Sequence, residues 1–124
     1  MNGFLLAAAV VSLVTFLVHL FAGGREVVNP LLNASDLLEV SKLTTYYCWH
    51  IVTFVLLTMA CAYGYAAFVQ LDSALVVVMT GIAAACTILS VGLIVARNLN
   101  PLEYPQWMLL GPIAILGTLG LTLA

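Results

Sequence analysis

Long apolar runs without charged residues are the feature that most constrains the fold of this 124-residue chain. A helix needs about 20 predominantly apolar residues to cross the hydrocarbon core of a bilayer. Four runs approach that length, and none has Asp, Glu, Lys or Arg in its interior. Because backbone polar groups in lipid must pair within their own segment, each run is expected to be a helix. The predicted spans cover about residues 3–22, 45–69, 73–96 and 106–124.

The composition agrees with a membrane environment. The chain is 65% hydrophobic and only 6% charged, whereas soluble domains carry roughly 25% charged residues. The first run lacks a preceding positive region, so it is interpreted as a span and not as a signal peptide. The sequence therefore predicts an all-α integral membrane protein with one domain over residues 1–124. A net charge of −2 with no basic stripe argues against a nucleic-acid partner.

The connections between the runs predict how the spans are ordered. The turn over residues 69–73 is tight, with Asp72 or Ser73 as the N-cap of the third span. The link over residues 97–105 is also short. Short connections place consecutive helices side by side, so we expect an antiparallel bundle of four transmembrane helices.

Only the first link, residues 22–44, is long. Gly23-Gly24 predicts the end of the first helix, and Asn29-Pro30 predicts a turn. Apolar residues then repeat at helical spacing over residues 35–43, with charged residues between them. This pattern is typical of a short amphipathic helix that lies in the membrane interface.

The basic residues predict the orientation in the membrane. Arg25, Lys42 and Arg97 all fall in the two links on one side of the predicted spans. The side with both termini has no Lys or Arg. By the positive-inside rule, links 22–44 and 97–105 are cytoplasmic and both termini lie outside, in a membrane of the bacterial inner-membrane type.

Aromatic residues mark the cytoplasmic boundary of the spans. Trp and Tyr favour the headgroup region because one end of each side chain is apolar and the other is wet. The stretch TTYYCWHIVTF, residues 44–54, is therefore expected to anchor the second span at the interface. The predicted belt consists of Tyr46, Tyr47, Trp49, Tyr104 and Trp107.

Two histidines stand out within this boundary. His19 and His50 each lie about one turn inside the cytoplasmic end of a predicted span, which places both roughly 5 Å below the interface. Polar side chains in lipid are expected to face the bundle interior. Three polar stripes should therefore line it: Ser12, Thr15 and His19; Tyr47, His50, Phe54, Cys61 and Tyr65; and Thr80, Thr87, Ser90 and Arg97.

These stripes predict a polar pocket near the cytoplasmic face. Its expected residues are His19, Tyr47, Trp49, His50 and Arg97, with Arg25, Glu26 and Glu103 from the links. Three interpretations stay open. The histidines could only join helices, at about 0.6 to 2 kcal/mol for each hydrogen bond. The pocket could bind the head group of a lipid- or quinone-like ligand, with Arg and His as donors. His19 and His50 could be the two axial ligands of a b-type haem.

The sequence favours a binding or accessory subunit over an enzyme. No phosphate loop, nucleophile elbow or HExxH motif is present, and the three cysteines form no CxxC. His50, Tyr47 and Glu103 offer acid–base groups, but no catalytic residue is assigned. A chain this small is expected to work in membrane lipid as a homo-oligomer or as part of a larger membrane complex. A purely structural subunit of such a complex is the remaining alternative.

Overall fold

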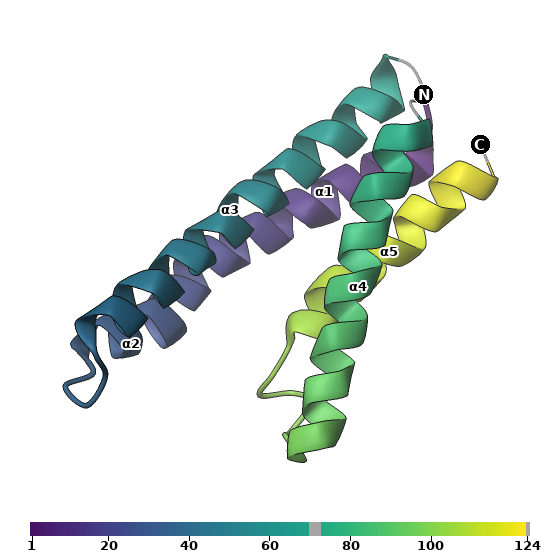
Figure 1. The fold of residues 1–124 in the computed structure, drawn as a ribbon. Helices are drawn as coiled ribbons and strands as arrows, with labels where there is room; N and C mark the ends of the chain where they lie inside the picture. The colour runs from purple at the N-terminus through teal and green to yellow at the C-terminus, as the bar shows by residue number, and fades with distance from the viewer. Residues whose placement is uncertain (70–72, 124) are drawn as a thin grey trace.

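The computed structural model describes residues 1–69 and 73–123, and these residues form an all-helical fold. The all-α class expected from the apolar runs is confirmed. The turn over residues 69–73, with its capping residues Asp72 and Ser73, depends on positions outside the described part. Figure 1 shows the elements, which are α1 (Gly3–Val18), η1 (His19–Val28), α2 (Asn29–Asn33), α3 (Glu39–Phe68), α4 (Ser73–Arg97) and α5 (Gln106–Thr122).

Three helices in the described part are long and apolar enough to cross a membrane. The first is the unbroken run Gly3–Asn33, the second is Glu39–Phe68, and the third is Ala74–Arg97. Helix α5 is apolar but has only 17 residues, or about 25 Å at 1.5 Å per residue. Residues 1–69 and 73–123 thus contain three helices suited to a membrane by length and composition, and one shorter apolar helix beside them.

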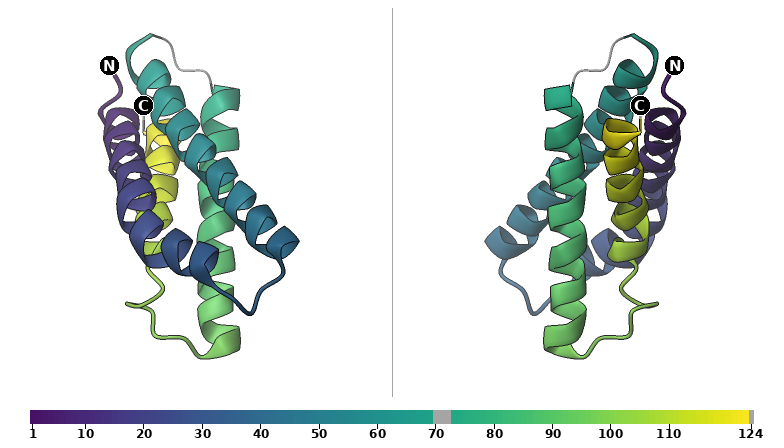
Figure 2. Two further views of the ribbon diagram at one scale, coloured as in Figure 1. Left: turned by 90° about the vertical axis from the view of Figure 1, so that its left-hand side faces the viewer. Right: turned by 90° about the vertical axis from the view of Figure 1, so that its right-hand side faces the viewer.

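The helices alternate in direction along the chain. Both termini, the end of α3 and the start of α4 lie at one end of the molecule, and α2 lies toward the other (Figure 1). Helix α1 packs against α3 and α5, while α4 packs mainly against α5. Helices α3 and α4 approach each other near the termini and diverge toward the opposite end (Figures 1 and 2). The arrangement is antiparallel but open at that end.

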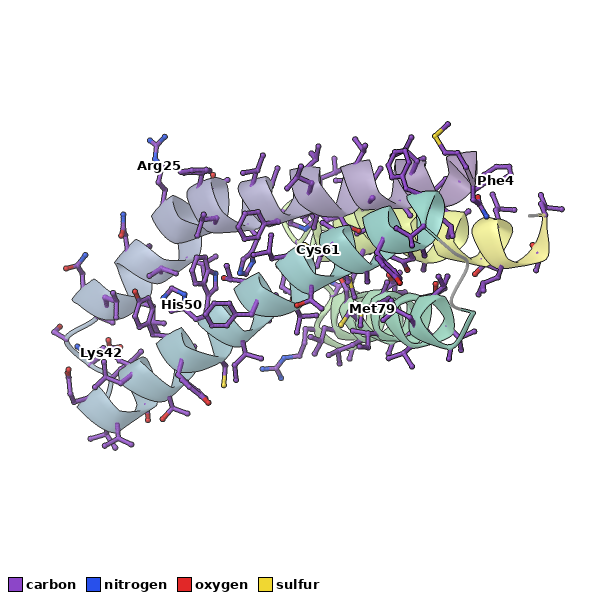
Figure 3. The ribbon with its side chains drawn as sticks, turned by 90° about the horizontal axis from the view of Figure 1, so that it is seen from above. Phe4, Arg25, Lys42, His50, Cys61 and Met79 are labelled. Atoms are coloured by element: carbon purple, nitrogen blue, oxygen red, sulfur yellow. The ribbon has the colours of Figure 1, made fainter. Side chains whose placement is uncertain are left out.

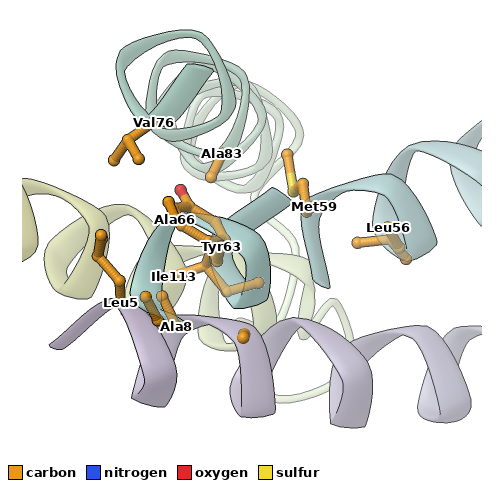
Figure 4. Packing of buried hydrophobic residues seen from close by; sticks show 11 residues of the cluster. Leu5, Ala8, Leu56, Met59, Tyr63, Ala66, Val76, Ala83 and Ile113 are labelled. Carbon is orange, nitrogen blue, oxygen red and sulfur yellow. The ribbon is translucent and has the colours of Figure 1, made fainter. Parts of the chain in front are cut away.

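The apolar core brings all four long elements together (Figure 4). Within it, the fully buried Tyr63 has its hydroxyl 3.0 Å from the hydroxyl oxygen of Thr80 on α4. A polar pair of this kind is a common link between apolar helices. The buried cluster consists of Leu5, Ala8, Ala9, Leu56, Met59, Tyr63, Ala66, Ala67, Val76, Ala83 and Ile113.

Asn2 joins three helices at the end that holds the termini. Its side-chain oxygen caps α1 by accepting hydrogen bonds from the backbone N–H groups of Phe4 and Leu5. Its side-chain amide donates to the carbonyl of Gly120 on α5 at 2.9 Å. Its backbone N–H donates to the carbonyl of Ala67 on α3 at 3.1 Å. This residue therefore holds the start of α1 against the ends of α3 and α5.

The first link differs from the prediction in where the helix ends. Gly23-Gly24 does not end the first helix, which continues as the π-helix η1 and then as α2 to Asn33. Asn29-Pro30 is not a turn, because Pro30 stands in the first turn of α2, where its missing N–H is tolerated. Continuing the helix keeps backbone groups paired near the hydrocarbon boundary, which a break at the glycines would not.

The helix predicted over residues 35–43 is confirmed only over residues 39–43, and residues 35–38 are not helical. The chain reverses over residues 34–38, and the helical part begins only at Glu39, as the first turns of α3. Lys42 closes this reversal by donating from its ammonium group to the carbonyl of Ala34 at 3.0 Å. Ala34 is the C-cap of α2, and a basic side chain is stabilising at the carbonyl end of a helix. The link is therefore a helical hairpin and not a separate interfacial helix.

Candidate functional site

His19 lies where the α-helical part of the first helix changes to the π-helical part. It is the first residue of η1, and its side chain reaches across to α3. The Nε2 atom is 3.2 Å from the backbone carbonyl oxygen of Trp49 and 3.1 Å from the hydroxyl oxygen of Thr53. The imidazole also stacks on the indole of Trp49, with ring centroids 4.4 Å apart and an interplanar angle of 20°. His19 is thus held by both polar and stacking contacts.

Trp49 connects the two histidines. Its indole lies nearly perpendicular to the imidazole of His50, with centroids 5.0 Å apart at 82°. Tyr46 meets the same imidazole at 4.5 Å and 78°. Both are edge-to-face arrangements that aromatic rings favour. We call His19, Tyr46, Trp49, His50 and Thr53 the imidazole cluster.

The backbone of η1 comes close to the imidazole cluster. A Cβ atom added to Gly23 would lie 3.7 Å from the indole nitrogen of Trp49, which is ordinary packing distance. The π-helical turns are also wider than α-helical ones, because each N–H bonds to the carbonyl five residues earlier. The bond from the Asn29 N–H to the Gly24 carbonyl has this spacing. At Gly23 the backbone of η1 therefore lies close to the indole of Trp49 on α3, with room for one methyl group between them.

His50 has no hydrogen-bond partner among the described residues, although it is only partly exposed. Figure 3 shows its side chain between α3 and the η1 helix. In the described part of the chain, the only fully buried side-chain polar atom without a partner is the hydroxyl oxygen of Ser90. The ring nitrogens of His50 are therefore unpaired but reachable from outside. The same holds for Nδ1 of His19, because only Nε2 of that ring is bonded.

The depth of the imidazole cluster follows from helix length. At 1.5 Å per residue, His19 lies about 24 Å along the helix from Gly3, and His50 lies about 27 Å from Phe68. The hydrocarbon core of a bilayer is about 30 Å thick. If the end with the termini marks one boundary, both imidazoles lie just inside the other. The two histidines therefore lie at similar distances along their helices from the end that holds the termini, and their depth in a membrane stays a prediction from the sequence.

The polar stripe on the first helix faces inward as predicted. Ser12 and Thr15 are buried, and the Thr15 hydroxyl donates to the carbonyl of Leu109 on α5 at 3.3 Å. On α4, Thr80 and Ser90 are buried and Thr87 is half-buried, so these three residues also face their neighbours.

The stripe predicted on α3 faces inward only at His50, because its other members, Tyr47, Phe54, Cys61 and Tyr65, are exposed. Phe54 is 67% exposed and Tyr65 is 52% exposed. The buried face of this helix instead includes Thr53, Leu56 and Met59. A helix that is apolar all round offers no polar face to mark which side is packed, so a single stripe of polar and aromatic residues was a weak guide.

Several expected pocket residues are not brought to the imidazole cluster. Tyr47 is 66% exposed and has no ring contact in the described part of the chain. Arg25 points away from α3 on the outer side of η1 (Figure 3), and its neighbour Glu26 is exposed. Of the residues predicted to form the pocket, the structure joins only His19, Trp49 and His50.

The other two expected pocket residues, Arg97 and Glu103, lie at the end of α4 that is far from α3 and in the link that follows it. Arg97 is exposed at the last turn of α4, where this helix has diverged from α3 (Figure 1). Glu103 is exposed in the following link and accepts a hydrogen bond from the side-chain amide of Asn100 at 3.1 Å. Neither residue contributes charge at the two histidines.

Sequence reasoning did not assign Tyr46 and Thr53 to the site. Tyr46 precedes His50 by four residues, and Thr53 follows Trp49 by four. Residues four apart are neighbours on a helix, so this spacing was an available signal. Residues three apart are neighbours as well, and spacing therefore does not decide between Tyr46 and Tyr47 as the partner of His50.

The contacts of the two histidines do not decide the haem prediction. Iron takes one lone pair from each imidazole, and Nε2 of His19 is engaged with Trp49 and Thr53, which leaves its Nδ1. The indole of Trp49 contacts both imidazoles. Among the described residues, no group of three or more His, Cys, Asp or Glu side chains could hold a metal ion. Ligation of a haem by His19 and His50 remains a prediction from the sequence.

The imidazole cluster can donate, accept and stack, but it has no carboxylate or thiolate beside it. That set of groups suits the binding of a neutral or weakly polar head group near the membrane boundary. Comparison of the chain with protein-family models, curated proteins and solved structures found no match.

Proposed function

We propose that the chain is a four-span integral membrane protein that acts as a binding or accessory subunit. In this proposal, the imidazole cluster between the first helix and α3 binds the head group of a lipid- or quinone-like ligand. The ligand approaches from the membrane, near the cytoplasmic face. The protein works as a homo-oligomer or within a larger membrane complex.

The observation that carries the proposal is the state of His50. Its imidazole is partly buried beside a stacked histidine and tryptophan, and it makes no hydrogen bond within the described residues. A polar group near hydrocarbon costs free energy unless a partner satisfies it. Because this imidazole remains reachable, a ligand head group can be that partner.

The local backbone offers further support. π-helical segments are rare and occur frequently at functional sites, and η1 begins at His19. The surrounding side chains suit the apolar part of an amphiphile. Val18 and Phe21 on the first helix, and Phe54 on α3, are all exposed, so an acyl or isoprenoid tail has apolar surface to follow.

The charge near the cluster narrows the ligand chemistry. The arginines expected to hold an anionic head group lie elsewhere, at the outer side of η1 and at the end of α4. No ion pair involves the cluster in the described residues. The proposal therefore favours a head group bound by hydrogen bonds and stacking over one bound by charge.

Native mass spectrometry tests the proposal. The protein is expressed in a bacterial inner membrane and transferred to lipid nanodiscs before its mass is measured. We expect the wild-type chain to carry a bound amphiphile. His50→Phe retains a ring between Tyr46 and Trp49 but has no ring nitrogens, so it should lose that mass. Tyr47→Phe is the matched control, because Tyr47 lies outside the imidazole cluster, and it should retain the mass.

The same spectra distinguish the alternatives. A wild-type chain that is bare at every stoichiometry would contradict ligand binding and favour a purely structural subunit. A ligand that remains bound to His50→Phe would show that the imidazole cluster is not the binding site. The added mass would identify a lipid, a quinone or a haem directly.

A further inference from the structure

The partners of His19 determine which of its ring nitrogens carries the proton. The carbonyl oxygen of Trp49 can only accept a hydrogen bond, and it lies 3.2 Å from Nε2. The Thr53 hydroxyl has a single hydrogen, which it donates to the same carbonyl at 3.1 Å. Both short contacts of Nε2 are therefore satisfied only if Nε2 carries the hydrogen, with Trp49 and Thr53 accepting from it.

The proton on Nε2 also determines whether Nδ1 donates or accepts a hydrogen bond. A neutral imidazole has one N–H group and one lone pair, so a proton on Nε2 leaves the lone pair on Nδ1. Nδ1 has no partner among the described residues and is not sealed from the outside. His19 therefore presents an acceptor, and any ligand group that satisfies it must be a donor.

We infer that the ligand head group carries a hydroxyl that donates to Nδ1 of His19, so that the site selects a membrane-soluble alcohol or phenol over the matching ether or ketone. This inference depends on the proposed function and names the class of its ligand. A ketone or ether oxygen cannot donate, and it would leave Nδ1 unpaired when the ligand covers the site. A buried acceptor without a partner costs binding free energy.

His50 also favours a ligand with a hydroxyl group. Its two ring nitrogens supply one donor and one acceptor, and its imidazole contacts the same indole as that of His19. A hydroxyl group can both donate and accept, so it can serve the lone pair of His19 while it accepts from His50. An oxygen that only accepts can serve His50 alone.

Titration of the nanodisc-embedded protein with four probes tests the inference. Decylhydroquinone, kept reduced under nitrogen, is the phenol, and 1-monoolein is the alcohol. The dimethyl ether of decylhydroquinone and decylbenzoquinone have matched tails but cannot donate. We expect at least one hydroxyl probe to bind about fivefold to tenfold more tightly than the ether and the quinone, which is the effect of one net hydrogen bond. The two hydroxyl probes distinguish a phenolic ligand from an alcoholic one.

His19→Phe is the variant that removes the acceptor. The phenyl ring can stack on Trp49 as the imidazole does, the Trp49 carbonyl still accepts from Thr53, and Phe has no lone pair in place of Nδ1. We expect this variant to bind all probes with similar affinity. ¹⁵N spectra of histidine-labelled protein, assigned with His50→Gln, provide a readout that does not depend on the variant folding. Nδ1 of His19 should be unprotonated in the free protein, and its signal should shift when the hydroxyl probe binds.

The outcomes separate this inference from the proposed function. Ether and quinone binding as tight as hydroxyl binding would overturn the selection while leaving the binding site in place. A protonated Nδ1 in the free protein, or a hydroxyl preference that persists in His19→Phe, would also overturn it. If no probe binds and native mass spectra show a bare chain, the proposed function fails together with this inference.

Discussion

Glycines in the helices have different roles according to what surrounds their α-carbons. A Cβ atom added to Gly117 on α5 would lie 2.8 Å from the hydroxyl oxygen of Tyr63 and would also collide with Thr80. These two residues form the buried polar pair between α3 and α4. By contrast, Gly81 on α4 is exposed and has no atom within 4 Å of an added Cβ. The first glycine is required for close packing, whereas the second is not.

Substitution of these two glycines gives a matched comparison. Gly117→Ala should destabilise the fold by about 1–3 kcal/mol, because the added methyl group must displace a buried polar pair. Gly81→Ala displaces nothing and should raise the free energy of unfolding by up to about 1 kcal/mol, because Ala favours a helix interior over Gly. Unfolding of each variant in mixed micelles, followed by circular dichroism as the denaturing detergent fraction rises, measures the difference. Equal stability of the two variants would contradict the packing of α5 on Tyr63 and Thr80.

The residues of the imidazole cluster were only partly predictable from the sequence. His19 and His50 were found because ionisable residues are rare within apolar runs, and Trp49 because aromatic residues cluster at the boundary. The aromatic contact to His50 comes from Tyr46, and the polar contact to His19 comes from Thr53. Helical spacing alone allows several neighbours for each histidine, so the choice among them depends on how the two helices pack.

The helical hairpin formed by the first helix and α3 shows why element boundaries were harder to predict than element existence. Gly23-Gly24 is an ordinary stop signal for a helix in water. Here the helix passes through it, and Gly23 lies beside the indole of Trp49. Near lipid, the cost of unpaired backbone groups outweighs the weak helix propensity of glycine. The reversal is displaced to residues 34–38, beyond the cluster.

Lys42 should control the stability of this reversal. Lys42→Met keeps a long apolar stem but loses the donor to the Ala34 carbonyl, which is 3.0 Å from the ammonium nitrogen. We expect a loss of about 1 kcal/mol, confined to the tip of the hairpin. Hydrogen exchange of the backbone amides over residues 31–42 should therefore become about fivefold faster, while α4 and α5 are unaffected.

Glu39→Gln is the control for the charge of Lys42. Glu39 lies 3.4 Å from the ammonium nitrogen but has a 73% exposed side chain, and exposed ion pairs contribute little. In the Glu39→Gln variant, hydrogen exchange of the backbone amides over residues 31–42 should match that of the wild type. If Glu39→Gln accelerates exchange as much as Lys42→Met does, then the ion pair, and not the carbonyl contact, holds the hairpin tip.

For the whole molecule, the alternation of the helices was predictable and their divergence was not. The apolar runs and the short links suffice to give helices of alternating direction with both termini at one end. The separation of α3 from α4 at the opposite end depends on which faces pack (Figures 1 and 2). Leu56 is buried while Phe54, two residues away, is exposed. Both are apolar, so hydrophobicity alone does not distinguish a face that meets lipid from one that meets a helix.

The orientation in the membrane is testable from the position of the basic residues. Arg25, Lys42 and Arg97 all lie in segments away from the end that holds the termini, so the positive-inside rule predicts that both termini face outward. In a bacterial host, alkaline phosphatase fused after the last residue should be active, and green fluorescent protein fused there should be dark.

Replacing Arg25 and Arg97 with Gln should produce a mixed population in which both reporters give signal, because only one basic side chain then remains to set the orientation. Replacing two of the acidic residues with Gln should leave the wild-type pattern unchanged, since the rule concerns Lys and Arg. If green fluorescent protein fused to the C-terminus of the wild-type chain is fluorescent, the predicted orientation is wrong. The imidazole cluster would then lie at the outer boundary of the membrane and not at the cytoplasmic one.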